Sequence, residues 1–251
     1  MSSIIRRRMV SLRTFSSPAP LLDFLAPNFI RTATITTSAA ARSQEANTSS
    51  TKPKPSTKPR NALTEAQQKY LERAIRVNQA GELAAVLIYA AQTPLVTRSH
   101  PYLRPLMKHM YDQEVGHFTT FNALLTKHRI RPTYMWPLWR VAASFLGWST
   151  AALGREAAMA CTEAVETTIG EHYNGQVRNL LAIMKDIEDK GEDVGEEFRQ
   201  LLKDLKRIRD EEVEHLDHAI EEHAREAPAY PLLSTVIQNG CKGAIWLSER
   251  T

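Results

Sequence analysis

Four glutamates and two histidines recur in this sequence in an order that could bind metal ions. A lone glutamate precedes a Glu-x-x-His motif, and the same order then repeats; the residues are Glu82, Glu114, His117, Glu166, Glu212 and His215. Residues three apart lie on one face of a helix, so each motif points a carboxylate and an imidazole in one direction. We expect the two lone glutamates to bridge two metal ions. Four oxygen and two nitrogen ligands are typical of four-helix bundles that bind two iron or two manganese ions.

The elements that must position these side chains are four long helices. Apolar residues recur every three to four positions, and the expected helices span residues 64–92, 102–128, 151–185 and 195–224. Thr64 and Gln67 predict a capping box at the start of the first helix, and Pro94 is expected to end it. An acidic stretch over 186–197 predicts a loop before the last helix. The fold class is therefore predicted to be all-α, a four-helix bundle.

The six side chains fall in the apolar rows of these helices, where a charged group is costly. An ionised carboxylate that faces a core destabilises the fold unless it is paired or bound to a metal. One such glutamate, taken alone, is usually a side chain at the edge of the row that reaches water. Four glutamates and two histidines, one set per helix, favour a dinuclear metal site over that explanation.

A few neighbouring residues leave alternatives open. Glu163 lies three residues before Glu166 and could be a rival ligand, an acid beside the ligands, or an exposed residue at the bundle edge. Tyr173 is in phase with Glu166 and could orient a ligand or relay an electron, although a core tyrosine explains it equally well. His218 and His223 are expected on the surface.

The N-terminal segment differs in composition from the rest of the chain. Residues 1–60 hold ten Lys and Arg against two acids, a net charge of +8, whereas the remainder, with 22 bases and 26 acids, carries −4. A nucleic-acid-binding domain needs its positive charge on the folded part, so nucleic acid is excluded as a partner. Residues 1–44 predict a mitochondrial transit peptide, with an untargeted basic tail as the alternative. Residues 45–60 predict a disordered Pro/Lys-rich linker, and 61–251 the functional domain.

Two further segments could contact a membrane. Residues 132–148 contain three of the four tryptophans and few charges, and residues 232–247 form a second amphipathic stretch. The first is too short and too interrupted to predict a membrane span, and aromatic anchoring at the interface suits it better. Packing against the ends of the bundle is the alternative for both.

Six short segments resemble those of a known family, the demethoxyubiquinone hydroxylases of ubiquinone biosynthesis. Four are similar to its signature stretches and two to its C-terminal end: 76–82 (RVNQAGE), 112–117 (DQEVGH), 160–166 (ACTEAVE), 210–215 (DEEVEH), 227–230 (APAY) and 247–250 (LSER). The resemblance covers about 61–251 and implies a ferritin-like bundle with additional membrane-associating helices. It places the family's metal ligands on the same six residues, and it matches His172 and Tyr173 to a His-Tyr pair beside them.

What the resemblance implies about activity is more specific than what the residues alone support. It implies two iron ions per chain that use O2 to hydroxylate the ring of a polyprenylated benzoquinone, with NADH as the electron donor. It also implies a peripheral position on the matrix side of the mitochondrial inner membrane. A lipid-binding partner of ubiquinone biosynthesis and a larger biosynthetic complex are the expected protein partners.

Three other functions share some of these features. A ferroxidase would use the same ligands but would not need the tryptophan-rich segment. A membrane-associated di-iron quinol oxidase would share both the ligands and the membrane surface. A non-enzymatic lipid-binding component of the biosynthetic assembly would keep the apolar surface and would survive the loss of Glu166.

Overall fold

The structure is a computed structural model that describes residues 63–251. The predicted transit peptide and linker lie outside the described residues. Within 63–251 the chain is helical and contains no strand, which confirms the all-α prediction. The elements in chain order are α1 (Glu65–Ser99), η1 (Pro101–Leu103), α2 (Arg104–His128), α3 (Trp136–Ala152), α4 (Arg155–Asp189), α5 (Glu196–Glu221), η2 (Ala224–Glu226) and α6 (Tyr230–Ser248).

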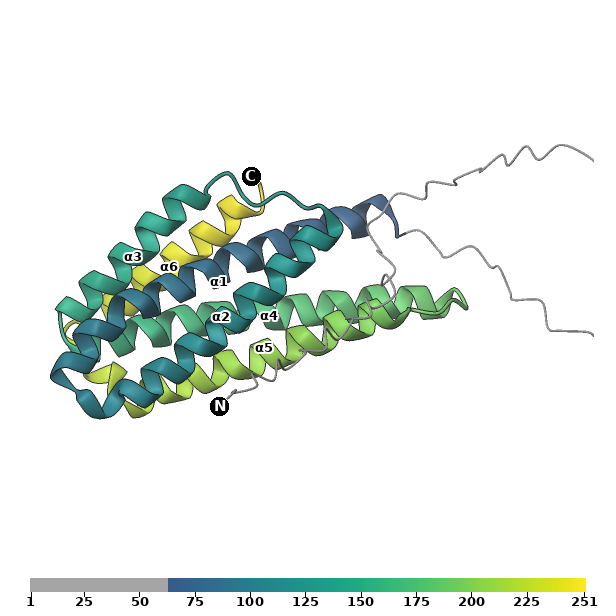
Figure 1. Ribbon diagram of the computed structural model, residues 1–251. Coiled ribbons are helices and arrows are strands. Elements are labelled where there is room, and N and C mark those ends of the chain that lie inside the picture. The colour runs from purple at the N-terminus through teal and green to yellow at the C-terminus, as the bar shows by residue number, and fades with distance from the viewer. Residues whose placement is uncertain (1–62) are drawn as a thin grey trace, which may run out of the picture.

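Four of these helices form an elongated bundle, and two shorter ones lie along one side of it (Figure 1). Helix α1 packs on α2, and α4 packs on α5. Helix α3 packs on α1 and α6 packs on α4, so both shorter helices flank the α1–α4 side. A hydrogen bond from Trp139 Nε1 to Ser248 Oγ (2.9 Å) joins the beginning of α3 to the end of α6.

The predicted helix boundaries are right at some ends and wrong at others. The capping box is confirmed, because the Gln67 amide donates to Thr64 Oγ1 (3.2 Å) and the Thr64 amide donates to Gln67 Oε1 (2.9 Å). Pro94 does not end α1, which continues to Ser99. Proline removes one hydrogen bond of the helix, but Val96, in the following turn, is buried, and tertiary packing of that turn outweighs the loss. The loop between α4 and α5 is also shorter than predicted.

Close packing of α3 on α1 depends on a glycine. A Cβ atom at Gly147 would lie 2.5 Å from the Ile88 carbonyl oxygen and 2.9 Å from Ile88 Cα, so no larger residue fits without moving one helix. The buried core contains three apolar clusters. One contains Ile75, Phe121 and Ile208, a second contains Met107, and a smaller third contains Ile88. Along each long helix, the predicted ligand residues lie between the first two clusters.

Candidate metal centre

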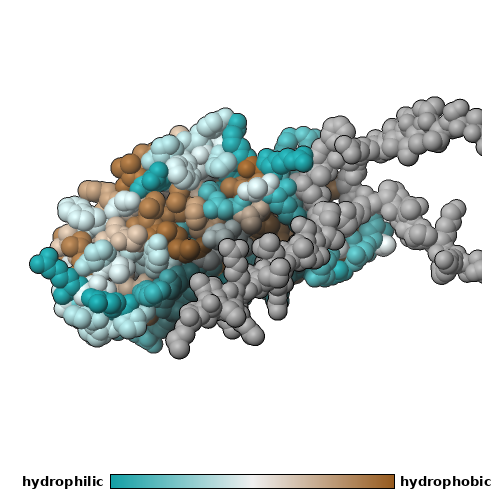
Figure 2. Space-filling view, in the orientation of Figure 1, coloured by the Kyte–Doolittle hydropathy of each residue, from teal (hydrophilic) through white to brown (hydrophobic). Residues whose placement is uncertain are grey.

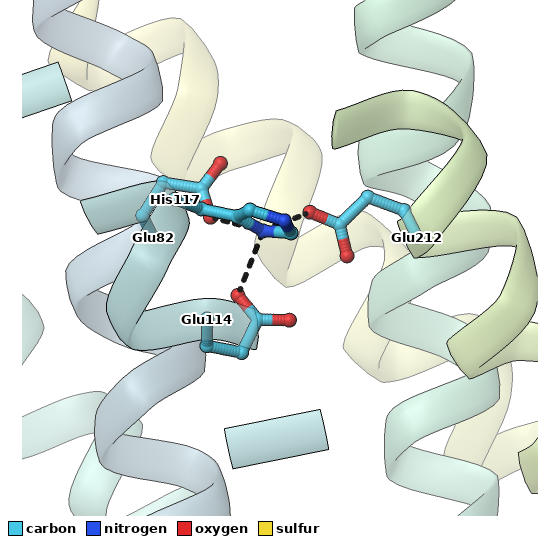
Figure 3. Close-up of side chains that lie close together, drawn as sticks. All are labelled: Glu82, Glu114, His117 and Glu212. Atoms are coloured by element: carbon cyan, nitrogen blue, oxygen red, sulfur yellow. Dashed lines mark ion pairs between the residues drawn. The ribbon is translucent and has the colours of Figure 1, made fainter. Parts of the chain in front are cut away.

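The structure brings all six predicted ligand residues into the middle of the bundle. Each is at most 3% exposed, and they come from α1, α2, α4 and α5. His117 Nδ1 lies 3.4 Å from Glu82 Oε2, 3.6 Å from Glu114 Oε2 and 3.3 Å from Glu212 Oε1 (Figure 3). His215 Nδ1 lies 3.0 Å from Glu114 Oε1 and 3.3 Å from Glu212 Oε2. Both imidazoles therefore turn the same nitrogen towards the carboxylates.

The side chains divide into two overlapping groups, each able to hold one metal ion. Within a group, one ligand atom from each residue lies within 4.8 Å of the others; the groups are Glu82, Glu114, His117 and Glu212, and Glu114, Glu166, Glu212 and His215. Glu114 and Glu212 belong to both groups, whereas Glu82 and Glu166 each belong to one. This grouping favours Glu114 and Glu212 as the shared carboxylates, in place of the lone glutamates expected from the sequence, because the two Glu-x-x-His motifs place their carboxylates between the two positions.

Many side-chain atoms of this cluster lack a hydrogen-bond partner and could instead bind metal ions. Buried side-chain atoms without a hydrogen-bond partner concentrate here: both oxygens of Glu114, one oxygen each of Glu82 and Glu212, and Nδ1 of His117 and His215. Buried polar groups are normally paired, so a cluster of unpaired polar atoms needs an explanation. Hard carboxylate oxygens with imidazole nitrogens suit a first-row divalent metal, and two such ions would satisfy these atoms.

The electrostatics of the centre favour positive charge strongly. Burial raises the pKa of Glu82 and of Glu166, and the nearby Glu212 carboxylate raises both further. Burial alone would lower the pKa of the two imidazoles. The carboxylates that face them reverse this, raising the pKa of His215 to about 10 and that of His117 well above its usual range. A cation at this place would be stabilised by several carboxylates in a region of low dielectric constant.

Two tyrosines, one on α1 and one on α4, donate hydrogen bonds to the glutamates that belong to a single ligand group. Tyr173 donates a short hydrogen bond to Glu82 Oε1, and Tyr89 donates to Glu166 Oε1 (3.1 Å). Each tyrosine is seven residues after the lone glutamate of its own helix and contacts the glutamate of the other helix. Burial raises the pKa of Tyr89 and of Tyr173 well above the usual range, so both hydroxyls stay protonated donors. Tyr89 is not among the residues predicted for the site, although its seven-residue spacing from Glu82 places both on one face of the helix.

Two polar residues outside the predicted set contact the outer nitrogens of the histidines. His117 Nε2 lies 2.5 Å from Glu211 Oε2, and His215 Nε2 lies 2.8 Å from Gln113 Oε1. Partial burial opposes the charge on Glu211, but hydrogen bonds from His117 and Arg207 hold its pKa below the usual range. One feature of the sequence could have indicated Gln113 and Glu211: each immediately precedes the glutamate of a Glu-x-x-His motif.

The other residues that the sequence predicted near the centre do not belong to either ligand group, and their contacts differ. Glu163 is buried, not exposed at the bundle edge, and its Oε1 accepts a hydrogen bond from Arg225 Nε (3.0 Å). His172 Nε2 contacts the Gln176 side chain (2.8 Å) and does not belong to either ligand group. His218 and His223 are partly or largely exposed, as predicted. The two cysteines, Cys161 and Cys241, are free thiols.

An apolar cavity of about 410 Å³ reaches the centre from the side of α3 and α6. Its walls come mainly from α1, α3, α4 and α6, with one residue from α5, and are apolar except for a few side chains. Those of the centre that line it are Glu82, Glu166, Tyr173 and Glu212. Ligand sites are commonly apolar clefts with a few convergent polar groups. An elongated apolar molecule could therefore bind here with one end at the carboxylates.

Exposed apolar side chains gather on the helices that frame this cavity. On α3 they are Leu138, Val141, Phe145 and Trp148, each more than half exposed; on α6 they are Leu232, Val236 and Trp246. The spacing within α3 puts its four residues on one stripe. Figure 2 shows hydrophobic surface over the end of the molecule where α3 lies. Among the described residues, α1 is the one helix long and apolar enough to cross a membrane, but its length and composition are also those of a core helix.

Comparisons with known proteins identify the family. The family described as "Ubiquinone biosynthesis protein COQ7" matches residues 69–248. The chain is 46% identical over 190 residues to "5-demethoxyubiquinone hydroxylase, mitochondrial" of Saccharomyces cerevisiae, covering 75% of this chain and 81% of the relative.

Two further relatives come from other organisms. The chain is 46% identical over 180 residues to "NADPH-dependent 3-demethoxyubiquinone 3-hydroxylase, mitochondrial" of Mus musculus, covering 72% and 77% of the two chains. It is 41% identical over 180 residues to "3-demethoxyubiquinol 3-hydroxylase" of Rhodospirillum rubrum, covering 72% and 78%. The resemblance seen in the sequence is confirmed, and the chain belongs to the COQ7 family of ubiquinone biosynthesis proteins.

Proposed function

We propose that this protein is a di-iron monooxygenase that hydroxylates the benzoquinone ring of demethoxyubiquinone with O2 in ubiquinone biosynthesis. The observation that carries the proposal is an apolar cavity that ends at a buried cluster of carboxylates and imidazoles. A polyprenylated quinone has the matching chemistry, with a long apolar tail and a polar ring. The names of the relatives support the same substrate.

The residues proposed to hold the two iron ions are Glu82, Glu114, His117, Glu166, Glu212 and His215. Bound iron would supply the activation of O2, chemistry for which proteins depend on a cofactor. Glu114 and Glu212 would be shared between the ions. Tyr89 and Tyr173 orient the unshared carboxylates through their hydrogen bonds. The apolar walls of the cavity exclude water from the reacting ring and orient it towards the centre.

We propose that the exposed apolar side chains of α3 and α6 lie in the surface of the mitochondrial inner membrane on its matrix side. The cavity opens between these helices, so a quinone could pass from the bilayer to the centre without crossing water. Arg140 and Arg250 lie over the rings of Trp136 and Trp246, at 4.8 and 4.2 Å from the ring centroids, and could reach lipid headgroups. The names of the relatives include "mitochondrial". A lipid-binding partner and a larger complex remain expectations from the family.

Electrons for the reaction are proposed to come from a reduced nicotinamide nucleotide. The expected donor was NADH, which is not confirmed, because the names of several relatives specify NADPH. Single turnovers with each nucleotide, measured at equal concentration, would distinguish the two donors.

The test of the proposal is a single turnover of the full chain loaded anaerobically with Fe(II) and supplied with demethoxyubiquinone, a reductant and ¹⁸O2. Mass spectrometry should find one labelled oxygen on the ring. An unchanged quinone, with iron oxidised and O2 consumed, would contradict the proposal and favour a ferroxidase or a quinol oxidase. Glu166→Ala tests the non-enzymatic alternative, since restored ubiquinone synthesis by this variant in a deficient cell would exclude an essential role for the centre.

A further inference from the structure

The two halves of the centre differ at one hydrogen-bonding position. Directly before its glutamate, the first Glu-x-x-His motif carries Gln113 and the second carries Glu211. Each of these side chains crosses to the opposite helix. Gln113 on α2 contacts His215 on α5, and Glu211 on α5 contacts His117 on α2. One imidazole therefore has a neutral amide as its outer partner, and the other has a carboxylate.

The imidazole rings of His117 and His215 are oriented alike, with Nδ1 towards the carboxylates and Nε2 towards the outer partner. Nδ1 of His117 and Nδ1 of His215 face the carboxylate cluster, and neither has a hydrogen-bond partner there. If Nδ1 binds a metal ion, Nε2 carries the hydrogen and donates it outward. The acceptors are Glu211 Oε2 at 2.5 Å and Gln113 Oε1 at 2.8 Å. Both rings are fully buried, so solvent does not mask the difference between the two acceptors.

The charged acceptor should strengthen metal binding at its own histidine. A hydrogen bond to a carboxylate is stronger than one to an amide, and it makes the imidazole a more basic ligand. Arg207 Nη1 also donates to Glu211 Oε2 (2.7 Å) and offsets part of its charge. The Arg207 side chain is 45% exposed, however, and water screens its charge more than that of the buried imidazole. The carboxylate therefore remains the stronger of the two acceptors.

We propose that Glu211 makes the His117 position the tighter of the two metal sites, while Gln113 leaves the His215 position weaker, so that the two ions bind in sequence. This inference rests on the proposed metal centre and adds an order of filling to it. Glu211 and Gln113 are positioning residues, because they act on the metal through an imidazole and do not contact it.

Stepwise titration of the metal-free full chain with Co(II) tests this order. Calorimetry gives the affinities, and the visible absorption of Co(II) reports the ligands of each ion as it binds. The wild type should show two steps. Glu211→Gln should weaken the first step by about 10–100-fold, which is the range typical of mutations at the outer partner of a metal-bound histidine. Glu214→Gln, which removes the same charge from a half-exposed position on the same helix, should leave the titration unchanged.

A swapped variant separates this effect from a loss of folding. Gln113→Glu combined with Glu211→Gln should again give two steps, with the absorption of the first-filled site changed. If two Co(II) ions bind but Glu211→Gln titrates like Glu214→Gln, the proposed order of filling is wrong and the metal centre stands. If the wild type fills in a single step with two equivalent ions, the order is also wrong. If the wild type binds no Co(II), the proposed metal centre itself fails.

Discussion

Metal loading should stabilise this fold, and the added stability should increase with pH. In the metal-free protein, Glu82, Glu166, His117 and His215 all have a raised pKa. A group whose pKa is higher in the folded state stabilises the fold fully below its unfolded pKa, and this contribution is lost as pH rises through the folded pKa. For His215 the window runs from 6.5 to about 10, and for the two glutamates it begins at 4.5. The metal-free protein should therefore lose stability as pH rises from 5 to 9.

The size of this pH effect on the free energy of unfolding follows from the number of protons that the folded state retains and the unfolded state releases. Each retained proton changes the free energy of unfolding by about 1.4 kcal/mol per pH unit. The two imidazoles together could lower it by about 3 kcal/mol between pH 7 and 8, which corresponds to roughly 6–12 °C in Tm for a domain of this size. Metal binding needs deprotonated ligands, so affinity for the metal rises over the same range. A site at a free metal concentration 100 times its Kd adds about 2.7 kcal/mol.

The assay is thermal unfolding of the full chain at pH 6, 7 and 8, followed by circular dichroism, with a chelator or with Fe(II) under anaerobic conditions. The difference in Tm between the two forms should be positive and should grow with pH. Glu114→Gln should lose most of this difference, since Glu114 belongs to both ligand groups, while Glu214→Gln should retain it. A difference in Tm that is absent, or that shrinks as pH rises, would refute the reasoning.

Three further predictions concern other parts of the molecule. Tyr89→Phe removes the donor to a buried Glu166 oxygen and should lower the free energy of unfolding of the metal-free protein by about 1–3 kcal/mol, measured by urea denaturation. Gly147→Ala should lower it by about 1–3 kcal/mol through overpacking against α1, whereas Gly243→Ala, with open space around its Cβ, should raise it by up to about 1 kcal/mol; equal effects at both glycines would contradict the close approach. Phe145→Ser should weaken sedimentation of the protein with anionic lipid vesicles several-fold, and unchanged sedimentation would argue against α3 as the membrane surface.

Much of the candidate site could be predicted because helical periodicity is a local property. The three-residue spacing of Glu114 and His117 places both side chains on one face whatever else the chain does, and the surrounding apolar residues show that this face is buried. The ends of the helices were less predictable. Pro94 is an ordinary signal for a helix end, but the packing of Val96 against other helices, which local sequence does not reveal, extends α1 beyond it.

The sequence alone determined the all-α class, the six residues that could bind metal, and the membership of a family, because each of these depends on spacing or on similarity along the chain. Only the tertiary structure decided that Glu114 and Glu212 belong to both candidate ligand groups, and that Gln113 and Glu211 reach across to the opposite histidines. These contacts join residues 94 and 102 positions apart. Their geometry depends on how α2 and α5 face each other across the bundle, and no local pattern of residues specifies that arrangement.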